Sequence, residues 1–233
     1  MNNHPKLQFK LNKTLDKKMC LAFFKIKAGG VDFGRSIITL HPTLKKASRL
    51  NIEEKRSFIS EYVDSFYLKY GSVLNTCLRK FSAEWQGVEE QFYFEVNKIF
   101  KGYLWPKGLY ICYLSIFSSG PRFLENKTFQ VYYRHSYGVK YFAFHEMLHF
   151  IFYDYIERKF AKKIKNLNSQ NIWVLSEVFN NIILSGPEFI KLTGKEPFFY
   201  PDHIDLTKKL MVIWNTCSDI DVFLKHCFSR KIL

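Results

Sequence analysis

The sequence predicts an α+β fold in which helices surround a small, mostly antiparallel sheet. Most of the 233 residues lie in segments whose apolar side chains recur at helical spacing, and only a few short segments alternate as strands do. The strand-like segments fall between two blocks of helices, an order typical of the α+β class. Hydrophobic residues make up 47% of the chain and charged residues 24%, so a single folded domain is expected over residues 1–233.

Residues 1–105 are expected to form a mainly helical part of that domain. The segment KLQFKLN at 6–12 alternates apolar and polar residues, which predicts an edge strand. Thr14 or Asp16 is then expected to cap the first helix. Apolar residues at helical spacing predict three helices in this part, over residues 14–30, 52–81 and 83–100.

Residues 106–233 are expected to form the core of the domain. Two segments rich in β-branched and aromatic residues predict strands at 108–117 and 128–134, and the second is expected to lie at an edge of the sheet. Mostly apolar helical patterns follow over 141–156 and 171–184, and one or two further helices are expected near the C-terminus.

The chain is strongly basic, with a formal net charge of +14 and a pI near 9.5. Such a charge could attract nucleic acid, an acidic membrane surface or acidic substrates. The lysines are dispersed, however, and only residues 158–165, RKFAKKIK, form a basic run. The sequence therefore favours a generally basic surface over a dedicated nucleic-acid site.

Two further features predict a cytoplasmic protein. The five cysteines are scattered and show no metal-binding or disulfide spacing, which is typical of buried thiols in a reducing compartment. The basic N-terminal residues are followed by no apolar stretch of the kind found in a signal peptide, and no apolar run is long enough to span a bilayer. A membrane span is therefore not expected, and the oligomeric state is left open.

The helix predicted over 141–156 carries the motif H-E-x-x-H, formed by His145, Glu146 and His149. Two histidines four residues apart project from one face of a helix and can bind one zinc ion. Glu146 lies beside the first histidine and can accept a proton from a water molecule that the zinc activates. Polar groups in so apolar a helix need partners, and a metal ion would provide one.

A catalytic zinc site usually has three protein ligands, so a third ligand is required. In the metzincins it lies six residues after the second histidine, where this chain has Tyr155, and Phe152 replaces the expected glycine. The metzincin family is therefore excluded. Glu177, on the helix predicted over 171–184, is the best candidate because it lies on a polar stripe of an otherwise apolar helix, together with Asn180 and Asn181.

At these residues the chain resembles the gluzincin metallopeptidases, the thermolysin-like group, and in size the small minigluzincins. The matching residues are His145, Glu146, His149 and Glu177. The resemblance covers residues 108 to about 184 and implies a zincin-like fold that cleaves peptide or protein substrates. It also implies that the edge strand, 128–134 here, pairs with an extended peptide. Asn181 stands where many members have a carboxylate that orients the first histidine, so only an amide hydrogen bond remains for that role.

A gluzincin-like site also needs a donor to the oxyanion of the reaction, and Tyr200 and His203 are the candidates for that catalytic role. His135, after the strand predicted at 128–134, is a further possibility. The spacing of these residues does not distinguish among them.

Two alternative functions remain. HEMLH and the later SGPEF resemble the SprT-like proteases, which act on proteins crosslinked to DNA, but their third ligand is a histidine where this chain has Ser185. A non-catalytic, zinc-stabilised binding module, such as a toxin–antitoxin or regulatory protein, would retain the metal without turnover. The expected function is nevertheless that of a zinc-dependent metallopeptidase, a hydrolase with Glu146 as its general base.

Overall fold

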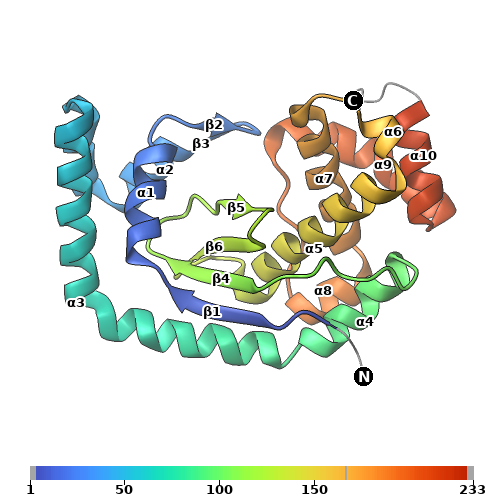
Figure 1. The fold of residues 1–233 in the computed structure, drawn as a ribbon, viewed down its shortest axis with the longest axis horizontal. Coiled ribbons are helices and arrows are strands. Elements are labelled where there is room, and N and C mark those ends of the chain that lie inside the picture. The colour runs from blue at the N-terminus through green and yellow to red at the C-terminus, as the bar shows by residue number, and fades with distance from the viewer. Residues whose placement is uncertain (1–3, 166, 230–233) are drawn as a thin grey trace. The chain divides into compact units, whose positions relative to one another are not determined.

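The computed structural model describes residues 4–165 and 167–229, and it confirms the predicted α+β class. Its described residues divide into two compact units. The sheet unit comprises Lys6–Gln86 and Gly108–Val139, and the helical unit comprises residues 4–5, 87–107 and 140–229 (Figure 1). Each unit is formed by stretches of the chain that are not continuous in the sequence.

The sheet unit is built on four strands in the order β1-β4-β6-β5. Their bounds are Leu7–Leu11 (β1), Tyr110–Ser115 (β4), Arg122–Phe123 (β5) and Thr128–Tyr132 (β6). β1, β4 and β6 are parallel to one another, and only β5 is antiparallel to β6. The prediction of a mostly antiparallel sheet was therefore wrong. Alternation shows which face of a strand is buried, whereas strand direction depends on the connections, and β1 and β4 are joined by a long helical crossover.

The prediction that 128–134 is an edge strand was also wrong. β6 lies between β4 and β5, so its backbone is paired on both sides (Figure 1). Gln130, for example, is paired with Tyr113 of β4, and its N–H donates to the carbonyl oxygen of Pro121 at 2.9 Å. β5 has only two residues, too few to show alternation in the sequence, yet it covers the edge on which a peptide was expected to bind.

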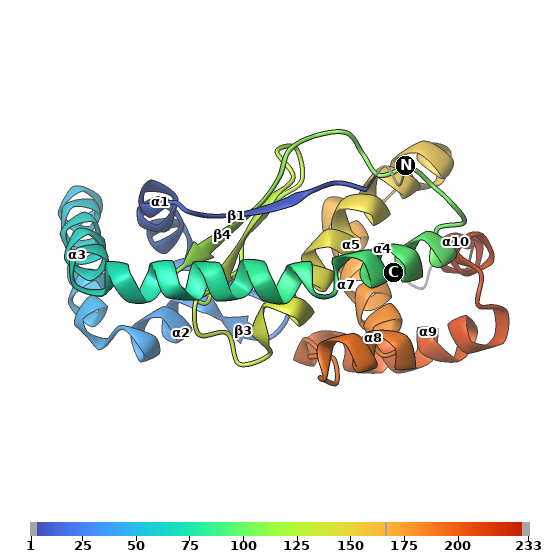
Figure 2. The ribbon, with the colours of Figure 1, turned by 90° about the horizontal axis from the view of Figure 1, so that it is seen from below.

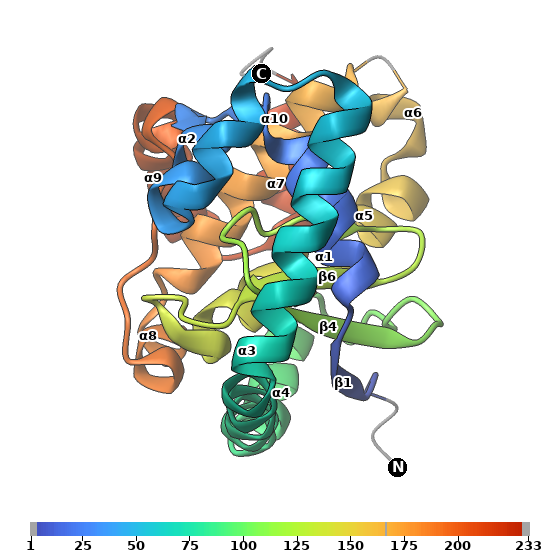
Figure 3. The ribbon, with the colours of Figure 1, turned by 90° about the vertical axis from the view of Figure 1, so that its left-hand side faces the viewer.

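The sheet unit also contains helices. They are α1 (Lys13–Phe23), α2 (Phe33–Leu40), the 3-10 helix η1 (Pro42–Arg49) and α3 (Ile52–Gln86), of which α3 contacts β1. α1 packs against α3, as Figure 3 shows. Figure 1 also shows that α3 bends midway, and the pair Gly71–Ser72 lies near the middle of its sequence, as is common at helix kinks.

The first helix begins and ends elsewhere than predicted. Its cap is Asn12, whose side chain accepts a hydrogen bond from the N–H of Leu15 at 2.9 Å. It ends at Phe23, because the following residues form a hairpin of β2 (Lys27–Ala28) and β3 (Val31–Asp32). Gly29 and Gly30 both have positive φ, as a two-residue turn between twisted strands requires.

Asp16, the other predicted cap, is instead a fully buried carboxylate in the sheet unit. Its two oxygens accept four hydrogen bonds, which join α1 to α3, β6 and the end of β4. The donors are Ser115 Oγ (2.6 Å), Gln130 Nε2 (2.7 Å), Tyr67 OH (2.8 Å) and Ile116 N (3.2 Å). Burial is the main influence and raises the pKa of Asp16 to about 6, although these hydrogen bonds lower it.

The helical unit contains the segments predicted to carry the metal site. Its elements are α4 (Glu89–Ile99), α5 (Gly138–Lys159), α6 (Ala161–Ile164), α7 (Ser169–Leu184), α8 (Pro187–Thr193), η2 (Pro201–His203), α9 (Ile204–Cys217) and α10 (Ile220–Ser229). All but the first two residues of α5 belong to this unit. In Figure 2 the chain can be followed from α7 through α8 and α9 to α10.

Aromatic rings form the core that fixes α5 against α7. Phe152 of α5 stacks on Phe179 of α7, with ring centroids 4.8 Å apart, and Phe144 of α5 stacks on Phe92 of α4 at 4.4 Å. Phe223 of α10 completes this cluster against Phe179 at 5.9 Å. All five rings are buried, so the two helices that carry the candidate ligands are held by apolar packing.

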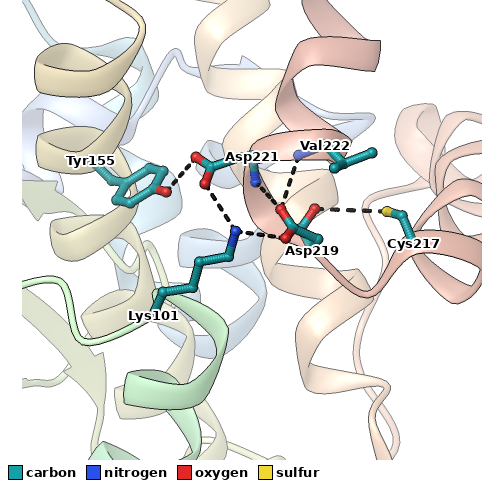
Figure 4. A network of polar contacts seen from close by, with 6 residues as sticks. All are labelled: Lys101, Tyr155, Cys217, Asp219, Asp221 and Val222. Atoms are coloured by element: carbon teal, nitrogen blue, oxygen red, sulfur yellow. Dashed lines mark hydrogen bonds and ion pairs between the residues drawn. The ribbon is translucent and has the colours of Figure 1, made fainter.

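A polar network ties α10 to α4 and α5 (Figure 4). The ammonium group of Lys101 lies 2.6 Å from Asp219 and 3.0 Å from Asp221, and Tyr155 OH donates to Asp221 at 2.6 Å. The ion pair with Lys101 lowers the pKa of Asp219, and the hydrogen bond from Tyr155 is the main cause that lowers the pKa of Asp221. Asp219 also accepts hydrogen bonds from the N–H groups of Asp221 and Val222, so it caps the start of α10.

Among the described residues, no helix combines the length and the apolar character that crossing a membrane requires.

Candidate metal centre

The two histidines of the H-E-x-x-H motif lie side by side on α5. They are one helical turn apart, and their Nε2 atoms lie 3.1 Å from each other. The helix is buried over most of its surface, as its apolar sequence predicted. His149 is fully buried, whereas 13% of the His145 side chain is exposed.

Glu177 on α7 completes the group. One carboxylate oxygen lies 3.0 Å from His145 Nε2, and the other lies 3.3 Å from His149 Nε2. Only 3% of the Glu177 side chain is exposed. The structure thus brings together the three residues that the sequence analysis selected as metal ligands, although 28 positions of sequence separate Glu177 from His149.

The spacing of the three residues fits a metal ion. Their candidate ligand atoms all lie within 4.8 Å of one another, and this is the one such group found among the described residues. Ligands of a tetrahedral zinc, at bond lengths near 2.0–2.1 Å, are about 3.4 Å apart. The contacts of 3.0–3.3 Å approach that value, so a small shift of the side chains would admit an ion. The group could therefore hold a metal ion.

The charge state of Glu177 also suits a ligand. Burial alone would raise its pKa, but the adjacent His149 and His145, by charge and by hydrogen bonding, hold the pKa of Glu177 well below its usual value. An ionised carboxylate in so buried a place requires a cationic or hydrogen-bonding partner. A divalent cation between the carboxylate and the two imidazoles would meet that requirement.

Glu146, the predicted general base, is buried beside the histidines, with 4% of its surface exposed. At 3.6 residues per turn, it projects about 100° around α5 from His145 and about 60° from His149. The Glu146 side chain therefore projects from α5 beside the face that carries the two histidines. A proton acceptor for a water molecule on a bound metal ion would be needed at such a place.

Asn181 does not make the hydrogen bond suggested for it. It is fully buried, and within the part of the chain that the structure describes, neither its amide nitrogen nor its oxygen has a hydrogen-bond partner. The preceding residue, Asn180, instead donates from Nδ2 to the backbone carbonyl of His145 at 2.8 Å. Asn180 thus ties α7 to α5 at His145, the first candidate ligand, a role that sequence spacing could not have assigned.

Tyr200 and His203 lie beside the ligand helix α7. Their rings contact Trp173, with centroid distances of 5.8 Å and 5.0 Å, and each other at 5.5 Å. Burial lowers the pKa of His203, and the negative charge of Glu177 opposes that effect. Both residues therefore pack against α7 one helical turn before Glu177. His135 belongs to the sheet unit.

Ser185 occupies the position of the third ligand in the SprT-like proteases. Its hydroxyl donates to the backbone carbonyl of Asn181 at 2.7 Å and so helps to end α7. Ser185 is therefore part of a helix terminus, and the three-ligand group is complete without it.

Two aromatic residues beside the candidate ligands were not predicted as part of the site. Tyr141 precedes His145 by four residues, and its ring lies roughly parallel to the imidazole at 6.4 Å. Trp173 precedes Glu177 by four residues and contacts Tyr200 and His203. The spacing of four residues was available in the sequence, but in chains this rich in aromatic residues it is more often a sign of core packing.

Comparisons of this chain with protein-family models, with curated proteins and with solved structures found no match. What this site does must therefore be inferred from its ligand geometry and its surroundings.

Proposed function

We propose that this protein is a zinc-dependent metallopeptidase of gluzincin type, which hydrolyses peptide bonds in peptide or protein substrates. The proposal rests chiefly on His145, His149 and Glu177, whose candidate ligand atoms all lie within 4.8 Å of one another. Glu146, which follows His145 in the sequence, is buried as well. Two histidines and one carboxylate are a donor set typical of catalytic zinc, which leaves a position open for water or substrate.

Each residue has a distinct role in the proposed reaction. Zinc bound by the three ligands would supply Lewis acidity, which acidifies water and polarises a carbonyl group. Glu146 would accept a proton from the attacking water and then deliver it to the leaving nitrogen as the C–N bond breaks. Tyr200 or His203 would donate a hydrogen bond to the oxyanion that forms when water adds to the carbonyl carbon. Asn180 would hold the backbone of the first ligand in place.

Partial exposure of His145 supports an open site rather than a purely structural one. His149 and Glu177 are buried, so a substrate would reach the metal from the side of His145. A structural zinc site normally has four protein ligands, and the described residues place only three in this group.

The test is the variant Glu146→Gln, with Glu157→Gln as its matched control on the exposed C-terminal part of α5. We expect Glu146→Gln to keep its fold and its zinc but to lose at least about 100-fold in peptidase activity, because an amide cannot accept the proton. Zinc content and hydrolysis of a mixed peptide library would be measured in parallel. Near-normal hydrolysis by Glu146→Gln would show that another residue is the base.

The same experiment decides against catalysis if the wild type binds zinc, is stabilised by it and hydrolyses no peptide. That result would favour the alternative of a zinc-stabilised binding module. Proteolysis that requires added DNA would favour the SprT-like alternative instead.

A further inference from the structure

A segment of irregular backbone, Lys195–Tyr200, connects α8 to η2 in the helical unit. α8 ends at Gly194, whose φ of +67° is the left-handed conformation that suits glycine. We call Lys195–Tyr200 the strap. It contains Pro197, and Pro201 follows it, so the backbone at both positions lacks an N–H group.

The strap is attached to the first ligand helix through Tyr141. The hydroxyl group of Tyr141 accepts a hydrogen bond from the N–H of Phe198 at 2.8 Å. The ring of the same tyrosine lies roughly parallel to the His145 imidazole, at an interplanar angle of 26°. Tyr141 itself is buried, with 5% of its surface exposed. One side chain thus touches both a candidate metal ligand and the strap.

The strap is attached to the second ligand helix through Trp173. Tyr200, the last residue of the strap, packs against the Trp173 ring, and His203 packs against it from η2. Phe198 and Tyr200 also contact each other, with ring centroids 5.9 Å apart. Trp173 and Tyr141 stand in equivalent places, each one helical turn before a ligand on its own helix.

These contacts place the strap against Tyr141, the neighbour of the partly exposed His145. His145 is the partly exposed ligand, and its neighbour Tyr141 is the residue that the strap contacts. Within the strap, 45% of the surface of Phe198 is exposed although its N–H group is held by Tyr141. The backbone N–H of Phe198 is therefore held by Tyr141 while its side chain remains exposed to solvent.

We propose that Tyr141 is a positioning residue: its hydroxyl group holds the strap across the entrance of the metal site, so that Tyr200 and His203 are kept beside the ligands. This inference rests on the proposed peptidase function for its effect on catalysis. The tether, by which we mean the hydrogen bond from the N–H of Phe198 to the Tyr141 hydroxyl, lies within the helical unit and can be measured without turnover.

The test is Tyr141→Phe, which removes one oxygen atom and keeps the ring against His145. Tyr155→Phe is the matched control, because it also removes a buried, hydrogen-bonded hydroxyl group from α5 but lies in the network with Asp221. Amide hydrogen exchange, read by mass spectrometry or NMR, reports on the N–H of Phe198 in the metal-free and zinc-loaded proteins. Zinc content and the separate values of kcat and KM would be measured on the same samples.

We expect the Phe198 amide to exchange about tenfold faster in Tyr141→Phe than in the wild type, with no such change in Tyr155→Phe. Zinc content should be unchanged. We expect kcat to fall several-fold with little change in KM, because the displaced donor, Tyr200 or His203, acts on the oxyanion rather than on the bound substrate.

Unchanged exchange at Phe198 in Tyr141→Phe would overturn the tether, and faster exchange with normal kcat would overturn its role in positioning. A wild-type protein that binds zinc but cleaves no peptide overturns the proposed function instead. The exchange measurement then still decides whether the tether exists.

Discussion

Glu177 and Asp16 are both buried carboxylates, yet their surroundings move their pKa values in opposite directions. Two histidines hold the pKa of Glu177 well below its usual value, against the effect of burial. Around Asp16 burial dominates and raises the pKa from 3.8 to about 6, against four hydrogen bonds from uncharged donors. The difference shows that neighbouring charge, rather than depth of burial, keeps Glu177 ionised, and an ionised carboxylate is the form that a cation would need.

The raised pKa of Asp16 predicts how stability depends on pH. Because the folded protein binds this proton more tightly than the unfolded chain, the contribution of Asp16 is greatest below pH 3.8 and is lost as the pH rises through about 6. A shift of this size corresponds to roughly 3 kcal/mol as an upper figure. In Asp16→Asn this dependence should disappear, so urea unfolding at several pH values between 4 and 7 should show a different slope from the wild type.

The slope, rather than the stability at one pH, is the diagnostic quantity. His41 is buried, and its Nε2 donates a hydrogen bond to the carbonyl oxygen of Ile116 at 2.8 Å, while its Nδ1 lies 2.7 Å from the hydroxyl group of Tyr62. Burial lowers the pKa of His41, so His41 destabilises the fold as the pH falls. That effect is present in both proteins and cancels in the comparison. Parallel pH profiles for the wild type and Asp16→Asn would contradict the assignment of the raised pKa to Asp16.

The three candidate metal ligands could be selected from the sequence because each of them belongs to a local pattern. His145 and His149 share a helix face whatever the rest of the fold does, and Glu177 is a charge in an apolar helix. Asn180 and Tyr141 could not be selected in this way. Their roles depend on how α7 and the strap approach α5, and that approach is determined by tertiary packing.

At the scale of elements, the periodicity of apolar residues predicted where the helices lie better than it predicted how the strands pair. α5 and α7 enclose the segments predicted at 141–156 and 171–184, because an apolar pattern along one helix is a local property. The expected break between the helices predicted over 52–81 and 83–100 was misplaced. α3 continues to Gln86, and the break comes at Gly87, before α4. Strand direction and the covering of β6 by β5 depend on distant pairings that alternation does not encode.

The network around Lys101 predicts a measurable contribution to the packing of α10. Tyr155 is buried, and its hydroxyl group donates to the carboxylate of Asp221 at 2.6 Å. Tyr155→Phe leaves that carboxylate with one partner fewer, so we expect a loss of about 1–2 kcal/mol in the free energy of unfolding, measured with urea at pH 7. The loss should shrink as the pH falls below about 4, where the aspartates of the unfolded chain are protonated.

Tyr70→Phe is a suitable control for that measurement, because the Tyr70 hydroxyl has no hydrogen-bond partner among the described residues. Equal losses in Tyr155→Phe and Tyr70→Phe would show that the bond to Asp221 contributes nothing specific.

At the scale of the whole molecule, the positive charge is unevenly distributed. Lys6–Gln86 and Gly108–Val139 hold 19 of the 35 basic residues but only 8 of the 21 acidic ones, a net charge of +11 against +3 for the rest of the chain. On η1 the side chains repeat every three residues, so Leu44 and Ala47 are buried while Lys45, Lys46 and Arg49 are exposed.

This distribution predicts that any binding to nucleic acid is governed by the sheet unit. We expect the triple variant Lys45→Glu, Lys46→Glu, Arg49→Glu to weaken binding to duplex DNA in a filter or anisotropy assay and to reduce the slope of log K against log salt by up to about 3. The control reverses the same number of charges in the basic run of the helical unit, at Lys162, Lys163 and Lys165. Equal effects of the two variants would indicate a general charge effect without a preferred surface.

The central claim is that His145, His149 and Glu177 form a zinc site, and metal content tests it most directly. The purified protein would be equilibrated with zinc, freed of excess metal and analysed by mass spectrometry of the metal, beside the double variant His145→Ala, His149→Ala. We predict about one zinc per chain in the wild type and almost none in the variant, since a single carboxylate cannot retain the ion. A wild type without zinc, or a variant that keeps it, would contradict the claim.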